Sequence, residues 1–584
     1  MSAPEHKTVR SLGWSWPSGL PAGRSLLTDI PIFAAGLALF YSVLVMARYW
    51  TGPLTPQVQI DLRPQALPVY AFYSVLRIGI AYLLSLGFTL VYGYIAAYNR
   101  TAERFMVPLL DILQSIPVLS FLPGVMLAMV SLFPRRQLGV ELGAILLIFT
   151  GQVWNMAFSF YTSLKNIPNE MREAAELYRF NWWQRFTQME LPYSIIGLIW
   201  NSIMSVAGGW FFLMACEMFV LGNRDFRLPG LGSYLQVASG AGDTRAILWG
   251  LAVMLAIIVL TDQLVWRPVI AWAEKFKFET VEAADVPRSP VLNFIRHSGV
   301  LGFLTRKTVL PVREAMAMRF ARQHRESRPV SGKTGWGKWM AFATGGVAAV
   351  GVGYAIWRSM VLLSGLGHRE FKVLVIGGLV TFIRVMITLL IGALWTVPAG
   401  VAIGTRPRLA RFAQPLAQIA ASVPATALFP VVLLGLIRLG GGLGIGSIVL
   451  LLMGTQWYIL FNVIAGATAI PTELKEVCSL YRFSRIERWR KLILPAIFPY
   501  LITGLVTASG GAWNASIIAE YFHLKGKIFS TAGLGAIISQ ATDDGNFTVL
   551  LAATILMAAI VVTINRLVWR RMYTLASTRF RLEM

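Results

Sequence analysis

The chain has 584 residues, of which 56% are hydrophobic and only 14% charged, and its formal charge is +24. Such an apolar composition excludes an ordinary soluble protein of this length. Several apolar runs exceed the ~20 residues that a helix needs to cross ~30 Å of hydrocarbon, so we expect an all-α membrane protein. Lys and Arg cluster between these runs, as the positive-inside rule describes, and no nucleic-acid-binding motif accompanies them.

Twelve apolar spans are predicted, arranged as two tandem repeats of six. The predicted parts are a cytoplasmic N-terminal segment (1–25), a first repeat (26–268), a cytoplasmic basic linker (269–338) and a second repeat (339–584). The expected spans are 28–49, 69–98, 105–132, 139–163, 193–221, 244–268, 339–361, 372–404, 411–437, 442–467, 496–522 and 547–570. Nearly all long basic stretches then fall on one side, which predicts that both termini are cytoplasmic.

The two halves repeat the same residues at nearly constant offsets. The offset is 307 early in each half and 303 later. The repeated features are Arg77 and Arg384, Ser115-Ile-Pro117 and Ser422-Val-Pro424, Trp154 and Trp457, Glu217 and Glu520, and Gly230-Leu-Gly232 and Gly533-Leu-Gly535. Because each half holds six spans, both halves have the same orientation and can pack with a pathway between them.

Each half also carries a charged, aromatic-rich loop, at 170–192 and 473–495. The core sequences are EAAELYRFNWWQRFTQMELP from Glu173 and EVCSLYRFSRIERWRKLILP from Glu476. Their spacing resembles the cytoplasmic EAA loop of ABC-importer permeases, in which Glu-Ala-Ala is followed at fixed distances by Gly and by Leu-Pro. The matching residues are Glu173, Ala174, Ala175, Leu191, Pro192, Glu476, Leu494 and Pro495. The family's Gly is replaced by Arg179 and Arg482, and its Ala-Ala by Val477-Cys478 in the second loop.

Across nearly the whole chain, the repeated motifs resemble the nitrate, sulfonate, taurine and bicarbonate permeases, in a duplicated form. This resemblance implies a permease of a bacterial or archaeal cytoplasmic membrane that takes up a small anion by alternating access. It implies two copies of an ATP-binding subunit, which hold ATP and Mg and dock on the EAA-like loops. It also implies a solute-binding protein outside. The chain itself is then a transport subunit and not an enzyme.

The repeated residues inside the spans are candidates for the pathway, each with an alternative. Arg77 and Arg384 either attract an anion at the outer mouth or snorkel to the interface. For Glu217 and Glu520 an internal structural or gating ion pair is favoured over substrate contact. Packing between helices is favoured over pathway lining for Trp154 and Trp457. The helix breaks at Pro117 and Pro424 are expected to line the cavity, where Ser115 and Ser422 would offer hydroxyls.

Three other functions fit parts of the sequence. Two parallel six-helix halves also suit a secondary transporter, and an ABC permease for a non-anionic solute would share the loops. A membrane scaffold would not need the repeated Arg and Pro residues within the spans.

Gly332-Lys333-Thr334 is not a phosphate loop because the required earlier glycine is Ser327, so we expect ATP to bind a partner.

Overall fold

A computed structural model describes residues 59–134, 136–221, 224–276, 290–296, 356–438, 442–524 and 527–579, with isolated positions between 30 and 52, between 303 and 354, and at 440. The expected first span, most of the seventh and most of the linker lie outside these residues. The boundaries of the four predicted parts therefore stay predictions.

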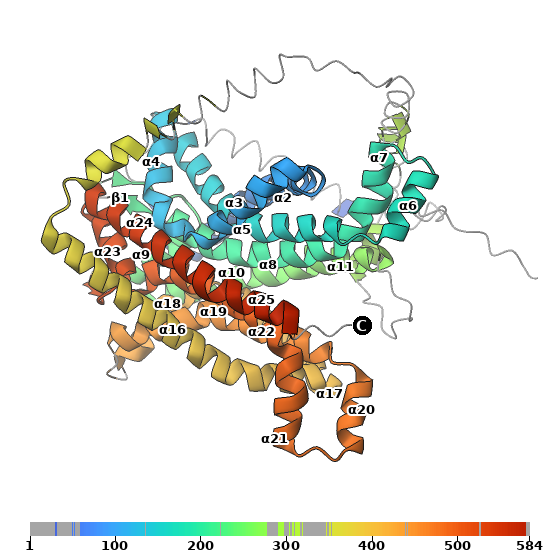
Figure 1. Ribbon diagram of the computed structural model, residues 1–584. Coiled ribbons are helices and arrows are strands. Elements are labelled where there is room, and N and C mark those ends of the chain that lie inside the picture. Colours follow the sequence, from blue (N-terminus) through green and yellow to red (C-terminus); the bar gives the residue numbers. More distant parts are fainter. Residues whose placement is uncertain are drawn as a thin grey trace, which may run out of the picture.

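The first half consists of long helices joined by short turns (Figure 1). Its elements are η1 (Pro64–Ala66), α2 (Leu67–Tyr98), α3 (Arg100–Ser115), η2 (Val118–Phe121), α4 (Leu122–Leu132), α5 (Leu138–Lys165), α6 (Asn169–Leu177), α7 (Trp182–Arg185), η3 (Phe186–Glu190), α8 (Leu191–Glu217), β1 (Val220–Leu221), β2 (Arg224–Asp225), α9 (Leu231–Ala241), α10 (Thr244–Thr261), η4 (Asp262–Trp266), α11 (Arg267–Ala273) and η5 (Glu274–Phe276).

The second half repeats this order after α12 (Pro290–Arg296). Its elements are α16 (His368–Thr405), α17 (Pro407–Ser422), α18 (Ala425–Arg438), α19 (Leu443–Thr468), α20 (Thr472–Leu480), α21 (Arg485–Arg488), η7 (Trp489–Ile493), α22 (Leu494–Ala519), β3 (Tyr521–Leu524), β4 (Lys527–Ser530), α23 (Leu534–Asp543), α24 (Phe547–Ile564), η8 (Asn565–Trp569) and α25 (Arg570–Arg579).

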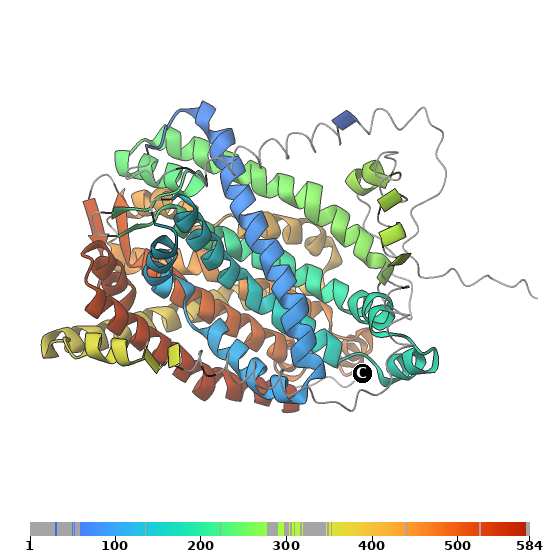
Figure 2. The same ribbon diagram turned by 90° about the horizontal axis from the view of Figure 1, so that it is seen from above.

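Eight helices of the described residues are long and apolar enough to cross a membrane, and two shorter apolar helices, 118–132 and 425–436, accompany them. Many apolar side chains on the outer face of α2 are exposed, as expected where lipid replaces water, and Figure 2 shows α2 in blue on the outside of the bundle. The prediction of an all-α membrane protein made of two repeats is confirmed.

The expected third and ninth spans are each two helices rather than one. The helices α3 and α17 end at Ser115 and Ser422, and the next residue in each case is extended. This residue precedes a proline, whose ring disfavours helical backbone at the position before it. The chain then resumes as η2 and α4 in the first half and as α18 in the second.

The two halves pack against each other at these breaks. The Leu119 amide donates to the Asn514 side-chain oxygen on α22 at 3.4 Å. The Thr554 hydroxyl on α24 donates to the Ser120 carbonyl at 3.0 Å. In the other direction, α18 contacts α8 and α9. Each broken span therefore lies at the interface between the halves.

Within each half the same helices pack together, α2 on α5 and α5 on α8, or α16 on α19 and α19 on α22. Glycines allow the close approach. A Cβ at Gly93 would lie 2.7 Å from the buried Phe160 ring, and one at Gly400 would lie 2.8 Å from the Val463 side chain. The repeated Gly93 and Gly400 are therefore packing residues.

We predict that Gly93→Ala lowers the apparent melting temperature of the detergent-solubilised protein, because overpacking a tight contact costs about 1–3 kcal/mol. Gly87→Ala on the same helix is the matched control, since a Cβ there meets nothing within 4 Å. Alanine favours helix over glycine, so the control should be neutral or stabilising by up to about 1 kcal/mol. Equal melting temperatures for the two variants would contradict the packing role of Gly93.

Candidate functional site

Two protruding loops lie at the same end of the molecule (Figure 1). In the first, α6 and α7 form a helical hairpin that leads through η3 into α8. In the second, α20 and α21 lead through η7 into α22. A capping box starts the second helix of each hairpin, formed by Asn181 and Gln184 in one loop and by Ser484 and Glu487 in the other.

The turn of each hairpin explains the spacing of the EAA-like motif. Arg179 and Arg482 have φ angles of 51° and 50°, and they are the only non-glycine residues with positive φ among the described residues. The Arg179 amide donates to the Glu176 carbonyl, and the Phe180 amide donates to the Ala175 carbonyl, both at 2.9 Å. These two bonds define a Schellman helix end, whose residue in the left-handed region is usually glycine.

The same two bonds end α20. The Arg482 amide donates to the Ser479 carbonyl and the Phe483 amide to the Cys478 carbonyl. Cys478 replaces the second alanine of the motif, and both Ala175 and Cys478 are buried under the aromatic residue that follows the turn. The replacement of glycine by arginine therefore changes the side chain but keeps the backbone conformation.

The Leu-Pro that ends each motif lies within a continuous helix. A proline in a helix has no N–H to donate and clashes with the carbonyl four residues before it. The π-helical turns η3 and η7 lie directly before Leu191-Pro192 and Leu494-Pro495, and such turns accommodate this interruption of the hydrogen bonds. One helix thus runs from Trp182 to Glu217, and another from Arg485 to Ala519.

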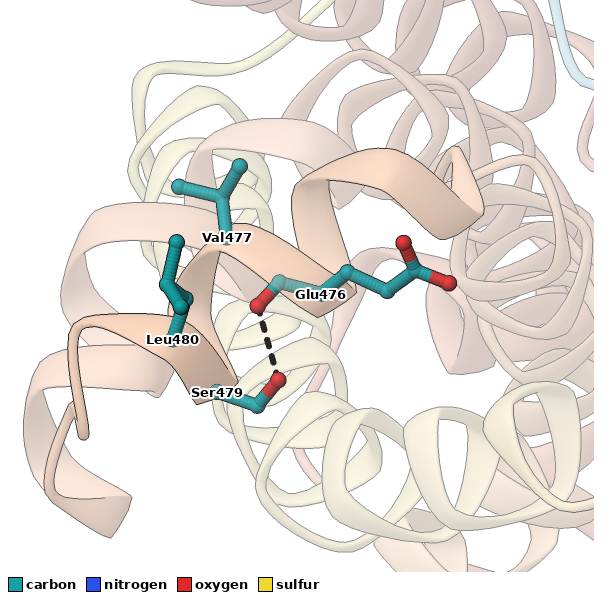
Figure 3. Close-up of a pocket in the computed structure, with 4 residues that line it drawn as sticks. All are labelled: Glu476, Val477, Ser479 and Leu480. Atoms are coloured by element: carbon teal, nitrogen blue, oxygen red, sulfur yellow. Dashed lines mark hydrogen bonds between the residues drawn. The ribbon is translucent and has the colours of Figure 1, made fainter.

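Large apolar side chains are exposed at the tips of both loops. Leu177 and Tyr178 are 81% and 74% exposed, and Leu480 and Tyr481 are 79% and 70% exposed. An open pocket lies beside them on α20, lined by Glu476, Val477, Ser479 and Leu480, where the Glu476 side chain points away from Val477 and Leu480 (Figure 3). Paired apolar residues on a polar, protruding helix are typical of a surface that binds another protein.

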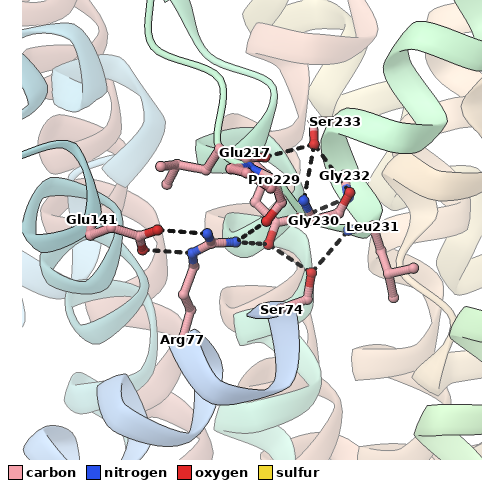
Figure 4. A network of polar contacts seen from close by, with 10 residues as sticks. Ser74, Arg77, Glu141, Glu217, Pro229, Gly230, Leu231, Gly232 and Ser233 are labelled. Atoms are coloured by element: carbon pink, nitrogen blue, oxygen red, sulfur yellow. Dashed lines mark hydrogen bonds and ion pairs between the residues drawn. The ribbon is translucent and has the colours of Figure 1, made fainter. Parts of the chain in front are cut away.

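At the opposite end of the first half, a buried arginine joins three helices (Figure 4). The Arg77 guanidinium donates to both oxygens of Glu141 at 2.7 Å and to Glu217 at 2.8 Å. All three side chains are fully buried. Glu217 also accepts from the Ser74 hydroxyl and from the Gly232 amide, both at 2.7 Å. The carboxylate at the end of α8 therefore binds α2 and the first turn of α9 at once.

The second half has the same arrangement with one carboxylate fewer. Arg384 pairs with Glu520, which also accepts from Thr381 at 2.9 Å and from the Gly535 amide at 2.9 Å. The residue that corresponds to Glu141 is Gly444, while the bond from Arg384 to the Ala532 carbonyl at 3.0 Å corresponds to the bond from Arg77 to the Pro229 carbonyl at 2.8 Å.

The Gly-Leu-Gly motif belongs to this network. A Cβ at Gly230 would lie 2.3 Å from the Glu217 carboxylate, and a Cβ at Gly533 would lie 2.1 Å from that of Glu520. Only glycine lets the backbone come so close to the carboxylate. The repeated glutamate and the glycines that follow it therefore form one structural unit.

A cavity of about 110 Å³ lies between the halves. It is bounded by α8 of the first half, by the break between α17 and α18, and by α19 and α22. Its polar groups include the Tyr458 hydroxyl and the Asn514 amide, and among the described residues no charged side chain lines it. The lining residues are Met204, Ala207, Gly208, Phe211, Phe212, Ala421, Val423, Pro424, Ala425, Met453, Gly454, Trp457, Tyr458, Phe461, Gly511, Asn514 and Ala515.

Only two of the predicted pathway residues, Pro424 and Trp457, line this cavity. Arg77, Arg384, Glu217 and Glu520 do not, because they neutralise one another inside the protein, and the arginines neither snorkel nor offer a free charge in this conformation. Trp154 and Pro117 also lie outside the lining. The hydroxyls of Ser115 and Ser422 fall outside the described side chains.

Sequence reasoning missed three residues that contact the ion pairs, Ser74, Thr381 and Glu141. Ser74 and Thr381 are separated by 307, so the offset of the early repeats pointed to them. Glu141 is an acid inside an apolar span, which by itself indicates a buried partner. The cavity lining was not predictable, since it combines faces of helices far apart in the sequence.

Two stretches of the chain, residues 89–265 and 396–581, match the family described as "Binding-protein-dependent transport system inner membrane component". Together they cover more than half of the chain. The chain belongs to this family. Each match includes one loop and one Glu–Gly-Leu-Gly unit, so both halves carry the family's features.

Known proteins of this type are each similar to about a third of this chain, within the length of one half. The nitrate import permease protein NrtB of Leptolyngbya laminosa is 28% identical over 185 residues, which cover 32% of this chain and 63% of that protein. The bicarbonate transport system permease protein CmpB of Synechococcus elongatus is 26% identical over 30% of this chain and 61% of its own length. A putative aliphatic sulfonates transport permease protein, SsuC of Bacillus subtilis, is 22% identical over 207 residues, which cover 35% of this chain and 70% of that protein.

We predict that Arg482→Gly keeps the end of α20 and that Arg482→Val disrupts it. Both changes remove the charge, but a β-branched residue in the left-handed region costs about 1–3 kcal/mol, whereas glycine adopts it freely. The measurement is the rate of maleimide labelling of Cys478, which is buried under this turn. Labelling should accelerate only in the valine variant, and Cys216 should stay unlabelled in both. Equal rates for the two variants would contradict the role of Arg482 in the turn.

We also predict that Glu217→Gln destabilises the protein far more than Glu141→Gln. The first change turns an amide nitrogen towards donors that Glu217 now accepts from, and breaking a buried ion pair costs about 3–5 kcal/mol. The Glu141→Gln variant still leaves Arg77 paired with the carboxylate of Glu217, as Arg384 is paired with Glu520 in the second half of the chain. Apparent melting temperatures in detergent test this order, and a reversed order would contradict the assigned role of Glu217.

Proposed function

We propose that this chain is the transmembrane permease subunit of an ATP-driven ABC importer, which takes up a small anion by alternating access. The observation that carries the proposal is the pair of loops with the same Schellman turn and the same exposed Leu-Tyr pair at one end of the molecule. A repeated apolar surface on two protruding hairpins fits two equivalent docking events. Membership of a transport family supports it.

The partners are two ATP-binding subunits, one under each loop, and a solute-binding protein on the other side of the membrane. ATP and Mg bind to those subunits, while this chain supplies the docking surfaces and the pathway. The loops and both chain termini are cytoplasmic. Support comes from the basic stretches, which favour the cytoplasmic side, and from α25, which ends near the loops (Figure 1).

The solute is a small anion of the nitrate, sulfonate, taurine or bicarbonate class. The similar permeases named above transport nitrate, aliphatic sulfonates and bicarbonate by their names, which supports this class. The cavity also supports a small solute, because its volume of about 110 Å³ holds only several water molecules, each of which needs roughly 10–15 Å³. Neutral donors such as the Tyr458 hydroxyl and the Asn514 amide can bind an anion with an affinity low enough for its release.

Coupling follows from the continuous helices. The tips of both loops lie directly before the helices that begin at Trp182 and Arg485 and continue as α8 and α22, and these helices bound the cavity. Closure of the ATP-binding pair would draw the two tips together and move α8 against α22. The cavity between them would then open to the other side of the membrane.

We expect the double variant Glu173→Ala and Glu476→Ala, reconstituted in vesicles with its ATP-binding subunits, to hydrolyse ATP but to lose anion uptake. Both carboxylates are exposed on the first helix of each hairpin, where a partner would meet them. Glu370→Ala, an exposed acid at the start of α16, is the control and should leave uptake unchanged. Full ATP-coupled uptake in the double variant would contradict the docking role of the two acids. Uptake driven by an ion gradient without ATP would contradict the ABC assignment.

A further inference from the structure

The two loops share a backbone but carry opposite charge. The first loop, residues 169–191, has four acids and three cations, and the second, residues 472–494, has three acids and six cations. In the first loop the exposed side chains include three carboxylates, on Glu170, Glu173 and Glu176, and one guanidinium, on Arg179. In the second, of the described side chains, the acid Glu476 is exposed, Glu487 is partly exposed and pairs with Lys491 at 3.4 Å, and five cations are exposed. They are Arg482, Arg485, Arg488, Arg490 and Lys491.

The first loop binds its other cations internally. The Arg185 guanidinium donates to the buried Glu190 carboxylate at 2.9 Å, and Tyr98 of α2 donates to the same oxygen at 2.6 Å. Arg172 donates to the carbonyls of Leu164 and Lys165 at the end of α5. These contacts hold the hairpin to the bundle and remove two positive charges from its surface.

The second loop lacks the acceptor that would do the same. The residue that corresponds to Glu190 is Ile493, and the residue that corresponds to Arg185 is Arg488, which is exposed. Arg485 replaces Trp182 and is also exposed. The positive surface of the second loop therefore results from specific replacements at the positions where the first loop is internally paired or aromatic.

Position along the helix separates two kinds of cation. Arg485 begins the helix, and Leu494 lies nine residues later, a rise of roughly 13 Å. The polar headgroup layer adds only about 6 Å to each side of the hydrocarbon core. With Leu494 taken as the edge of the hydrocarbon core, Arg485 and Arg488 lie beyond the lipid headgroups, whereas Arg490 and Lys491 lie about one turn before Leu494, at headgroup depth.

We propose that the second loop is an electrostatic anchor, in which Arg485 and Arg488 attract an acidic rim around the docking groove of an ATP-binding subunit. The first loop docks through its apolar tip without this attraction, so the two docking sites are not interchangeable. This inference rests on the proposed function, since it specifies the partner surface that meets each loop. A subunit with an acidic rim meets like charge at Glu170 and Glu176, which weakens docking at the first loop.

The test uses the full complex in native membranes, with a photoreactive benzoyl-phenylalanine in place of Tyr178 or Tyr481. Both are exposed aromatic residues at equivalent positions, so each probe replaces like with like. Cross-linking to the ATP-binding subunit is measured in 0.1 M and 1 M NaCl, between which the screening length falls from about 10 Å to about 3 Å. We expect cross-linking at position 481 to fall roughly fivefold and cross-linking at position 178 to change by less than about twofold.

The matched variants are Arg485→Gln with Arg488→Gln, and Arg490→Gln with Lys491→Gln. Only the first pair should reproduce the loss at position 481 in 0.1 M NaCl, and neither should alter position 178. All four side chains are exposed, so both variants should elute as the folded protein in size-exclusion chromatography. Equal losses from both pairs would assign the effect to lipid headgroups and overturn the proposal, as would equal salt dependence at the two positions. Cross-linking at neither position, with the complex intact, would instead contradict the docking function itself.

Discussion

A buried charge in a membrane protein must be paired, and this requirement organises one end of each half. The carboxylates of Glu217 and Glu520 lie at the ends of α8 and α22, and each accepts hydrogen bonds from an arginine, a hydroxyl and the first turn of the next helix. An unpaired carboxylate there would cost several kcal/mol. The glycines of the Gly-Leu-Gly motif are needed because the backbone touches the carboxylate. The motif is therefore a consequence of charge pairing and not a separate binding element.

Much of the fold could be predicted from the sequence, because duplication repeats every local signal. The two loops, the breaks before Pro117 and Pro424, and the grouping of Arg77 with Glu217 all followed from residue types at constant offsets. The number of helices was harder to predict, since an apolar run such as 105–132 that contains a proline fits both one kinked helix and two separate helices. The arginines in place of the motif's glycine left the loop's shape open. The structure resolves this, because both adopt the left-handed conformation that glycine favours.

The site was predictable only where one segment contains it. The coupling loops are continuous in sequence, so their residues could be named in advance. The cavity brings Phe211 of the first half next to Trp457 and Asn514 of the second, and no pattern within a single segment specifies which helix faces meet. The role of the arginines was left open for a related reason. Their charge fitted either anion attraction or snorkelling, whereas acids from other helices neutralise them, including Glu141, which has no counterpart in the second half.

The continuity of the helix through the proline has a mechanical consequence. Because η3 keeps the backbone helical from Trp182 to Glu217, these 36 residues form one rod roughly 50 Å long. The loop tip forms one end, and the carboxylate that binds α2 and α9 forms the other. If that far end acts as a pivot, a tilt of about 5° shifts the tip by about 4 Å, while the part beside the cavity, from Met204 to Phe212, lies closer to the pivot and moves about a quarter as far, about 1 Å. Small residues such as Ala207 and Gly208 lie where the rod borders the cavity, so a tilt of the rod changes the space available to the solute at these residues.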